Sequence, residues 1–255
     1  MAFIIILVLI IAALIALGYF LKEPDDKYLK SDKKAAKVWL AIKHGIKWFN
    51  QEFIKFPLYL MSHPVDGFDR FKRDKKAKMS VAIVYIFLMV VVQVARYQFT
   101  GFAVKAYDVN KLNALLEAAY VIAPVLALTV SNWSLTTLFD GKGTMKEIFM
   151  LIGYALMPLF WTRVFALIAS NFITADQLAI YTLLNGIGIF LTVYMLFMGL
   201  MSIHEYGVLK CIGSILGTIV ALLVICFAGI LVFDLVQKMW GFIYTIYQEL
   251  TLRYF

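Results

Sequence analysis

The stretch from Phe139 to Pro158, FDGKGTMKEIFMLIGYALMP, contains the pattern that decides the fold. Its first half is polar and rich in glycine, and its second half opens an apolar run that extends over residues 148–171. Another apolar run, over residues 114–138, precedes it. Each run exceeds the ~20 residues that a helix needs to cross a lipid bilayer. The stretch therefore predicts a short turn between two membrane-spanning helices.

The turn contains local signals for the end of one helix and the start of the next. Asp140, Gly141 and Gly143 predict a tight reversal, because aspartate and glycine tolerate the backbone angles that turns require. Thr144 is placed to cap the following helix, and Glu147 lies three residues further on, which completes a capping box. We therefore expect the second helix to begin immediately after Thr144.

The composition of the whole chain agrees with a membrane protein. The 255 residues are 63% hydrophobic and 16% charged, and the mean hydropathy is +0.84. Soluble domains have roughly 45–50% apolar and about 25% charged residues. A soluble enzyme is excluded on these grounds. Because only helices satisfy their backbone groups within a single apolar run, the class predicted is an all-α integral membrane protein.

Six transmembrane helices account for most of the length. The first apolar run, Ala2 to Leu21, is uncharged and is expected to be a retained N-terminal anchor over residues 1–21, with cleavage near Ala16 to Gly18 as the alternative. A five-span domain over residues 79–233 is predicted to follow. Its apolar runs lie at about 79–102, 114–138, 148–171, 178–201 and 212–233.

The distribution of basic residues predicts the orientation. Residues 22–78 contain 15 of the 24 lysines and arginines, and the side that receives this segment holds 18 of them against 5 on the other side. Since basic loops stay in the cytoplasm, we expect residues 22–78 to be cytoplasmic and both termini to be external. The expected location is the cell (plasma) membrane.

Two segments outside the spans have amphipathic patterns. Between residues 34 and 56 apolar side chains recur every three to four positions, which predicts a helix that Pro57 ends. This helix either lies in the membrane surface with its lysines toward anionic lipids or packs on the cytoplasmic face of the bundle. The tail, residues 234–255, is rich in tryptophan and tyrosine and is expected to form a second, external interfacial helix.

Candidate sites are few. Glu117 and Arg163 lie in the outer half of consecutive antiparallel spans, so they are a candidate intramembrane pair, either a polar site for an ion or solute or a structural pair. No phosphate-binding loop, nucleophile elbow or regular spacing of cysteine and histidine occurs, and His204-Glu205 has no second histidine at the spacing of a zinc protease. We therefore expect no catalytic residue, no cofactor, no metal and no nucleic-acid partner.

Partner contacts are expected where small or aromatic residues lie outside the five-span domain. Ala12 and Ala16 form a small-residue face on the first span, and small faces are where helices associate in lipid. We expect this face and the adjoining cytoplasmic helix, through Trp39, Phe49 and Phe53, to contact a partner. The GxxxG pair of Gly213 and Gly217 favours close packing, either inside the bundle or between two chains.

The quoted stretch resembles the Yip domain, found in the Ypt-interacting protein family of polytopic membrane proteins. The residues that carry the resemblance follow the form F-x-G-x-G-[ST] and then G-Y-x-x-x-P; they include Gly141, Gly143, Gly153, Tyr154 and Pro158. The segment from Met61 to Phe68 is similar to the family's cytoplasmic lead-in, so the resemblance covers about residues 61–233. It implies a five-span, non-enzymatic domain with a cytoplasmic N-terminal side. Eukaryotic members act in membrane trafficking through small GTPases, whereas the extra N-terminal span and the short loops look more like the bacterial-type branch.

These observations together predict a non-catalytic membrane scaffold or accessory subunit. Its expected partners are membrane lipids and another integral membrane protein or a transport complex. A small-solute transporter or channel is the alternative, although the polar residues within the spans are sparse. A lipid-interacting or membrane-shaping protein, suggested by the basic helix over residues 34–56, is the weaker alternative.

Overall fold

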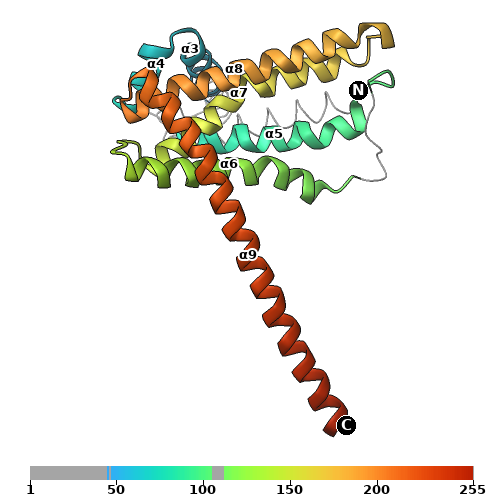
Figure 1. Ribbon diagram of the computed structural model, residues 1–255. Coiled ribbons are helices and arrows are strands. Elements are labelled where there is room, and N and C mark those ends of the chain that lie inside the picture. The colour runs from blue at the N-terminus through green and yellow to red at the C-terminus, as the bar shows by residue number, and fades with distance from the viewer. Residues whose placement is uncertain (1–44, 46, 105–111, 255) are drawn as a thin grey trace, which may run out of the picture.

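The computed structural model describes residue 45 and residues 47–104 and 112–254, and over these residues the chain is entirely helical outside its loops and turns (Figure 1). The elements follow one another in chain order. They are η1 (Phe49–Lys55), α3 (Phe56–Ser62), α4 (Pro64–Lys72), α5 (Met79–Phe99), α6 (Ala114–Leu138), α7 (Met145–Ala169), η3 (Ala175–Gln177), α8 (Leu178–His204) and α9 (Val208–Tyr254).

Five of these helices, α5 to α9, are long and apolar enough to cross a membrane. The all-helical, multi-span class predicted from the sequence is confirmed at this level. The expected N-terminal anchor, residues 1–21, lies outside the described residues, as do Ala12, Ala16 and Trp39. The sixth span therefore stays a prediction.

The centre of the bundle is α7, which packs against α5, α6 and α8. Helices α5 and α7 approach so closely that a Cβ added at Gly153 would lie 2.6 Å from the Cβ and 2.8 Å from the Cα of Ala82. Helices α7 and α8 also pack tightly at a glycine, because a Cβ at Gly188 would lie 1.9 Å from the side-chain Oγ1 of Thr162. Small residues therefore set the spacing of the helices, as is usual in lipid.

The segment before α5 closes one end of the bundle. Phe53, Leu60, Phe68 and Phe71 are each at most 2% exposed and belong to the same core as Tyr154 of α7. The ring of Phe53 stacks on that of Tyr85, with 4.3 Å between their centroids, and Phe49 stacks on Phe53. In its described part, the amphipathic helix thus packs on the bundle rather than lying separately in the membrane surface.

This packing corrects the expectation that Phe53 contacts a partner, because a side chain only 2% exposed has no free surface to offer. The same region corrects the expectation that Pro57 ends the helix. The chain stays helical to Ser62, and the turn before Pro57 widens to the π-helix η1. The carbonyl of Phe53, four residues before the proline that lacks an N–H, accepts a hydrogen bond from the Tyr85 hydroxyl.

Helix α9 corrects the predicted division between a last span and a separate tail helix. It runs without a break for 47 residues, which corresponds to about 70 Å. The charged residues at the expected boundary do not interrupt it, since Asp234 and Lys238 form an ion pair of 2.7 Å one helical turn apart. In Figure 1, α9 begins at the end of the bundle near α4 and extends away from the other helices.

We expect replacement of Gly153 by alanine to lower the melting temperature of the purified protein in mild detergent. The added methyl group would meet the backbone of Ala82, which cannot rotate away, and such overpacking costs about 1–3 kcal/mol. Gly186→Ala is the matched control, because beyond the adjacent residues and backbone of its own helix no described atom lies within 4 Å of a Cβ at Gly186. Equal melting temperatures for the two variants would contradict the close α5–α7 contact.

Candidate functional site

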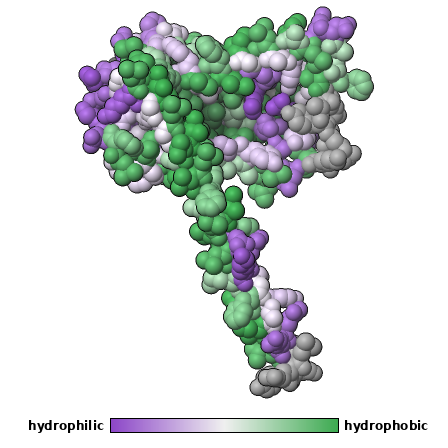
Figure 2. Space-filling view, in the orientation of Figure 1, coloured by the Kyte–Doolittle hydropathy of each residue, from purple (hydrophilic) through white to green (hydrophobic). Residues whose placement is uncertain are grey.

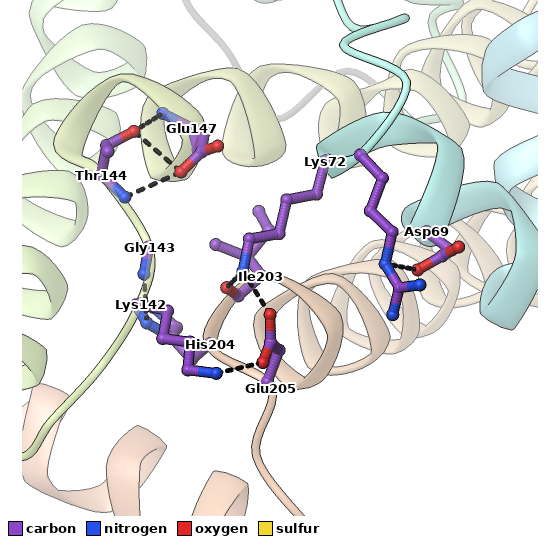
Figure 3. Close-up of polar contacts among 10 residues, drawn as sticks. Asp69, Lys72, Lys142, Gly143, Thr144, Glu147, Ile203, His204 and Glu205 are labelled. Carbon is purple, nitrogen blue, oxygen red and sulfur yellow. Dashed lines mark hydrogen bonds and ion pairs between the residues drawn. The ribbon is translucent and has the colours of Figure 1, made fainter.

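Two polar clusters join the helices, one at each end of the bundle. The first, here called the loop junction, lies where the loop between α6 and α7 meets the loop between α8 and α9 and the end of α4 (Figure 3). Glu205 is at its surface and forms ion pairs with Lys72, at 3.0 Å, and with Lys142. Lys72 also donates a hydrogen bond of 2.8 Å to the carbonyl of Ile203. One carboxylate thus connects three separate segments of the chain.

These two lysines stabilise the ionised form of the Glu205 carboxyl. Hydrogen bonds from Lys142 and then from Lys72 lower the pKa of the Glu205 carboxyl from 4.5 to about 2. Its backbone is in the left-handed region, with φ of 56°, which is uncommon for a residue with a side chain. Glu205 forms the C-cap of α8, so this conformation ends the helix and turns the chain toward α9.

His204 lies beneath Glu205 and is 2% exposed. Its Nδ1 accepts a hydrogen bond of 3.2 Å from the backbone N–H of Gly143, and its Nε2 lies 3.1 Å from Oδ1 of Asn132. Because Nδ1 accepts, the ring proton is on Nε2, which donates to Asn132. Asn132 in turn donates to the hydroxyl of Thr218 at 2.9 Å. This chain of hydrogen bonds links α6, α8, α9 and the turn before α7.

Gly141 and Gly143 are required because the turn before α7 packs directly against His204 and the end of α6. A Cβ at Gly143 would lie 2.6 Å from Cε1 of His204, and a Cβ at Gly141 would lie 2.6 Å from Cβ of Thr136. Asp140 precedes them with a φ of 54°, in the left-handed region. The tight reversal expected at these residues is therefore present, and its reason is the space occupied by His204 and by the end of α6.

The remaining residues of the quoted stretch have structural contacts in α7. Thr144 and Glu147 form the capping box that the sequence predicted. The Tyr154 hydroxyl accepts a hydrogen bond of 3.0 Å from the backbone N–H of Lys78, which joins α7 to the start of α5. Pro158 lies inside α7, which continues through it to Ala169.

The second cluster, here called the Gln93 cluster, lies at the opposite end of the spans. Gln93 of α5 donates from Nε2 to Glu117 at 3.0 Å and accepts at Oε1 from Arg163 at 3.1 Å. Glu117 is 5% exposed and accepts a second hydrogen bond, of 2.6 Å, from the Tyr97 hydroxyl. The structure thus brings the two predicted residues, Glu117 and Arg163, to the same amide side chain.

Sequence reasoning missed Gln93, Lys72 and the role of His204. A glutamine within an apolar run is a weak signal, and nothing in the sequence says which neighbour it meets. A histidine at the end of an apolar run, next to a glutamate, is a usable signal for a buried polar contact, which its interpretation as half of a zinc motif does not capture. Neither cluster contains a nucleophile paired with a base, and no group of three or more potential metal ligands occurs in the described part of the chain.

The comparison with known families identifies the domain to which these residues belong. The sequence model of the Yip1 domain matches residues 58–230, from α3 into α9. No curated protein and no solved structure matches the chain. The matched region includes both clusters, and residues 1–57 and the last part of α9 lie outside it.

The lowered pKa of Glu205 predicts a dependence of stability on pH. Because the folded-state pKa of about 2 lies below the ordinary value of 4.5, the carboxylate stabilises the fold above pH 4.5, and this contribution is lost as the pH falls toward 2. We expect the difference in melting temperature between the wild type and Glu205→Gln to narrow between pH 5 and pH 3. Glu249→Gln, an exposed change on α9, should show no such narrowing. A constant difference for Glu205→Gln would contradict the ion pairs.

Replacement of Gln93 by leucine should destabilise the bundle by about 1–3 kcal/mol, because Glu117 and Arg163 each lose a partly buried hydrogen-bond partner. The measurement is the melting temperature in mild detergent. Asn185→Leu is the control, since the Asn185 amide donates to a carbonyl of its own helix, that of Tyr181. If Gln93→Leu is no less stable than the control, the cluster does not hold the helices together.

Proposed function

The chain belongs to the Yip1 domain family, and on that premise we propose that it is a non-catalytic scaffold or accessory subunit that binds other membrane proteins, such as a transport complex. The family is not known as enzymatic. In both polar clusters the described side chains bond to one another, which supports a role in packing rather than in chemistry.

The observation that carries this proposal is the exposure of α9. In the most apolar 18-residue stretch of α9, none of the residues is buried. In the corresponding stretches of the other four spans, between 22% and 61% of the residues are buried. Helix α9 contacts α6 near its beginning, where Gly217 meets Leu135 and Thr218 meets Asn132. From Phe227 to Thr251 every residue is exposed, and Figure 2 shows its apolar surface extending from the bundle.

Two features of α9 favour a protein partner in addition to lipid. Beyond the adjacent residues and backbone of α9 itself, no described atom lies within 4 Å of a Cβ added at Gly213 or Gly229, so a second helix could approach the backbone closely there. The helix, at about 70 Å, is also far longer than the ~30 Å hydrocarbon core of a bilayer. Its last part, with Trp240 and Tyr247 exposed, therefore offers a surface at or beyond the membrane interface.

The finer arrangement that we propose rests on the sequence. Residues 1–21 form a sixth span, residues 22–78 are cytoplasmic, and both termini are external to the plasma membrane, as the basic residues indicate. The short loops favour the bacterial-type branch of the family. Ala12 and Ala16 remain a proposed second contact for the partner, which the exposed α9 complements.

A site-specific photo-crosslinker tests the scaffold proposal. With benzoylphenylalanine at Phe227 of α9, 64% exposed, we expect a covalent adduct to one defined membrane protein, identified by mass spectrometry. The same probe at Phe190 of α8, 70% exposed, is the matched control and should give no such adduct. A protein that purifies without a partner and whose melting temperature rises with a small solute would instead support the transporter alternative.

A further inference from the structure

A basic pocket of about 480 Å³ opens at the end of the bundle where α5 begins. It is bounded by η1, α3, the end of α4 and the residues that lead into α5. Five cationic side chains line it against two acidic ones. The cations are Lys55, Arg70, Lys75, Lys76 and Lys78, and the acids are Glu52 and Asp74. In Figure 2, hydrophilic residues gather at the end of the bundle where α3 and α4 lie.

The positive charge of this pocket is not balanced within the described part of the chain. Glu52 pairs with Lys78 at 2.7 Å, which leaves the other cations opposite a single acid, Asp74. Among the described residues, no ion pair involves Lys55, Lys75 or Lys76. Arg70 is likewise without an ion pair there, and its guanidinium lies 5.0 Å from the centroid of the Tyr59 ring, which holds it at the pocket wall.

We place the pocket at the level where a bilayer meets water, because it adjoins the start of the apolar helix α5. Lys78 is the N-cap of α5, whose apolar span starts at Met79, and no side chain caps this helix end. The partial positive charge of the helix terminus therefore adds to that of the lysines. Phe56 and Tyr59 supply an aromatic part of the wall. Lys75, in the left-handed region with φ of 50°, turns the chain so that Lys75, Lys76 and Lys78 all line the pocket.

We propose that this pocket binds the phosphate-bearing headgroup of an anionic lipid. Lysine and arginine are the side chains that bind phosphate oxygens, through charge and through the bidentate guanidinium. The volume falls within the roughly 300–1,000 Å³ of small-ligand sites. A site that is cationic, partly aromatic and placed at the start of a span matches a lipid whose charge and acyl chains point in opposite directions. The proposal does not depend on the scaffold function.

Native mass spectrometry of the full chain, released from mild detergent, tests this site. The probes are dioctanoyl phosphatidic acid and dioctanoyl phosphatidylcholine, titrated separately. We expect the wild type to bind the phosphatidic acid more tightly, and the double variant Arg70→Gln with Lys76→Gln to lose roughly tenfold or more of that preference. The matched control is Lys146→Gln with Lys210→Gln, which removes two exposed cations at the same end of the bundle and should retain the preference.

Two further measurements distinguish loss of charge from loss of fold, and a lipid from a free anion. The charge-conserving pair Arg70→Lys with Lys76→Arg should bind as the wild type does, which separates loss of charge from loss of fold. An equal concentration of inorganic phosphate should not displace the lipid, and full displacement would overturn the lipid assignment in favour of a free anion. The proposal is also overturned if the pocket variant keeps the preference, or if the control variant loses as much of it.

Discussion

The arrangement of the bundle depends on positions where a glycine lets a neighbouring helix pack directly against its backbone. Gly153 of α7 lies against the backbone of Ala82 in α5, and Gly188 and Gly199 of α8 lie against Thr162 and Leu151 of α7. In lipid, burying leucine against leucine has no advantage over burying it against acyl chains, so close van der Waals contact decides which helices associate. Helix α7 has such contacts on two sides, and it is the most buried of the five spans.

The polar clusters at the two ends complement this close packing. A polar group within a span has no water to bond, so each needs a partner on another helix or on its own backbone. Gln93 satisfies Glu117 and Arg163 at one end, and His204 satisfies Asn132 and the turn before α7 at the other. The glycine-rich turn over residues 139–144 thus has a structural explanation: Gly141 and Gly143 make room for His204, and the capping box of Thr144 and Glu147 starts the central helix.

Two surfaces of the protein take no part in this packing. Within the described part of the chain, helix α9 is apolar and exposed along most of its length, and the pocket before α5 is lined mainly by cations. These two surfaces are the basis of the proposals that the protein binds a membrane protein and an anionic lipid.

The sequence alone determined the features that depend on neighbours along the chain. Apolar runs predicted the helices, and the spacing of Thr144 and Glu147 predicted the capping box, because both patterns are local. Only the tertiary structure decided that Phe53 is part of the core, that Gln93 lies between Glu117 and Arg163, and that α9 continues past Asp234 away from the bundle. These features depend on contacts between residues that are far apart in the sequence. The periodicity of a segment shows that one of its faces is apolar, but it does not show which other segment packs against that face.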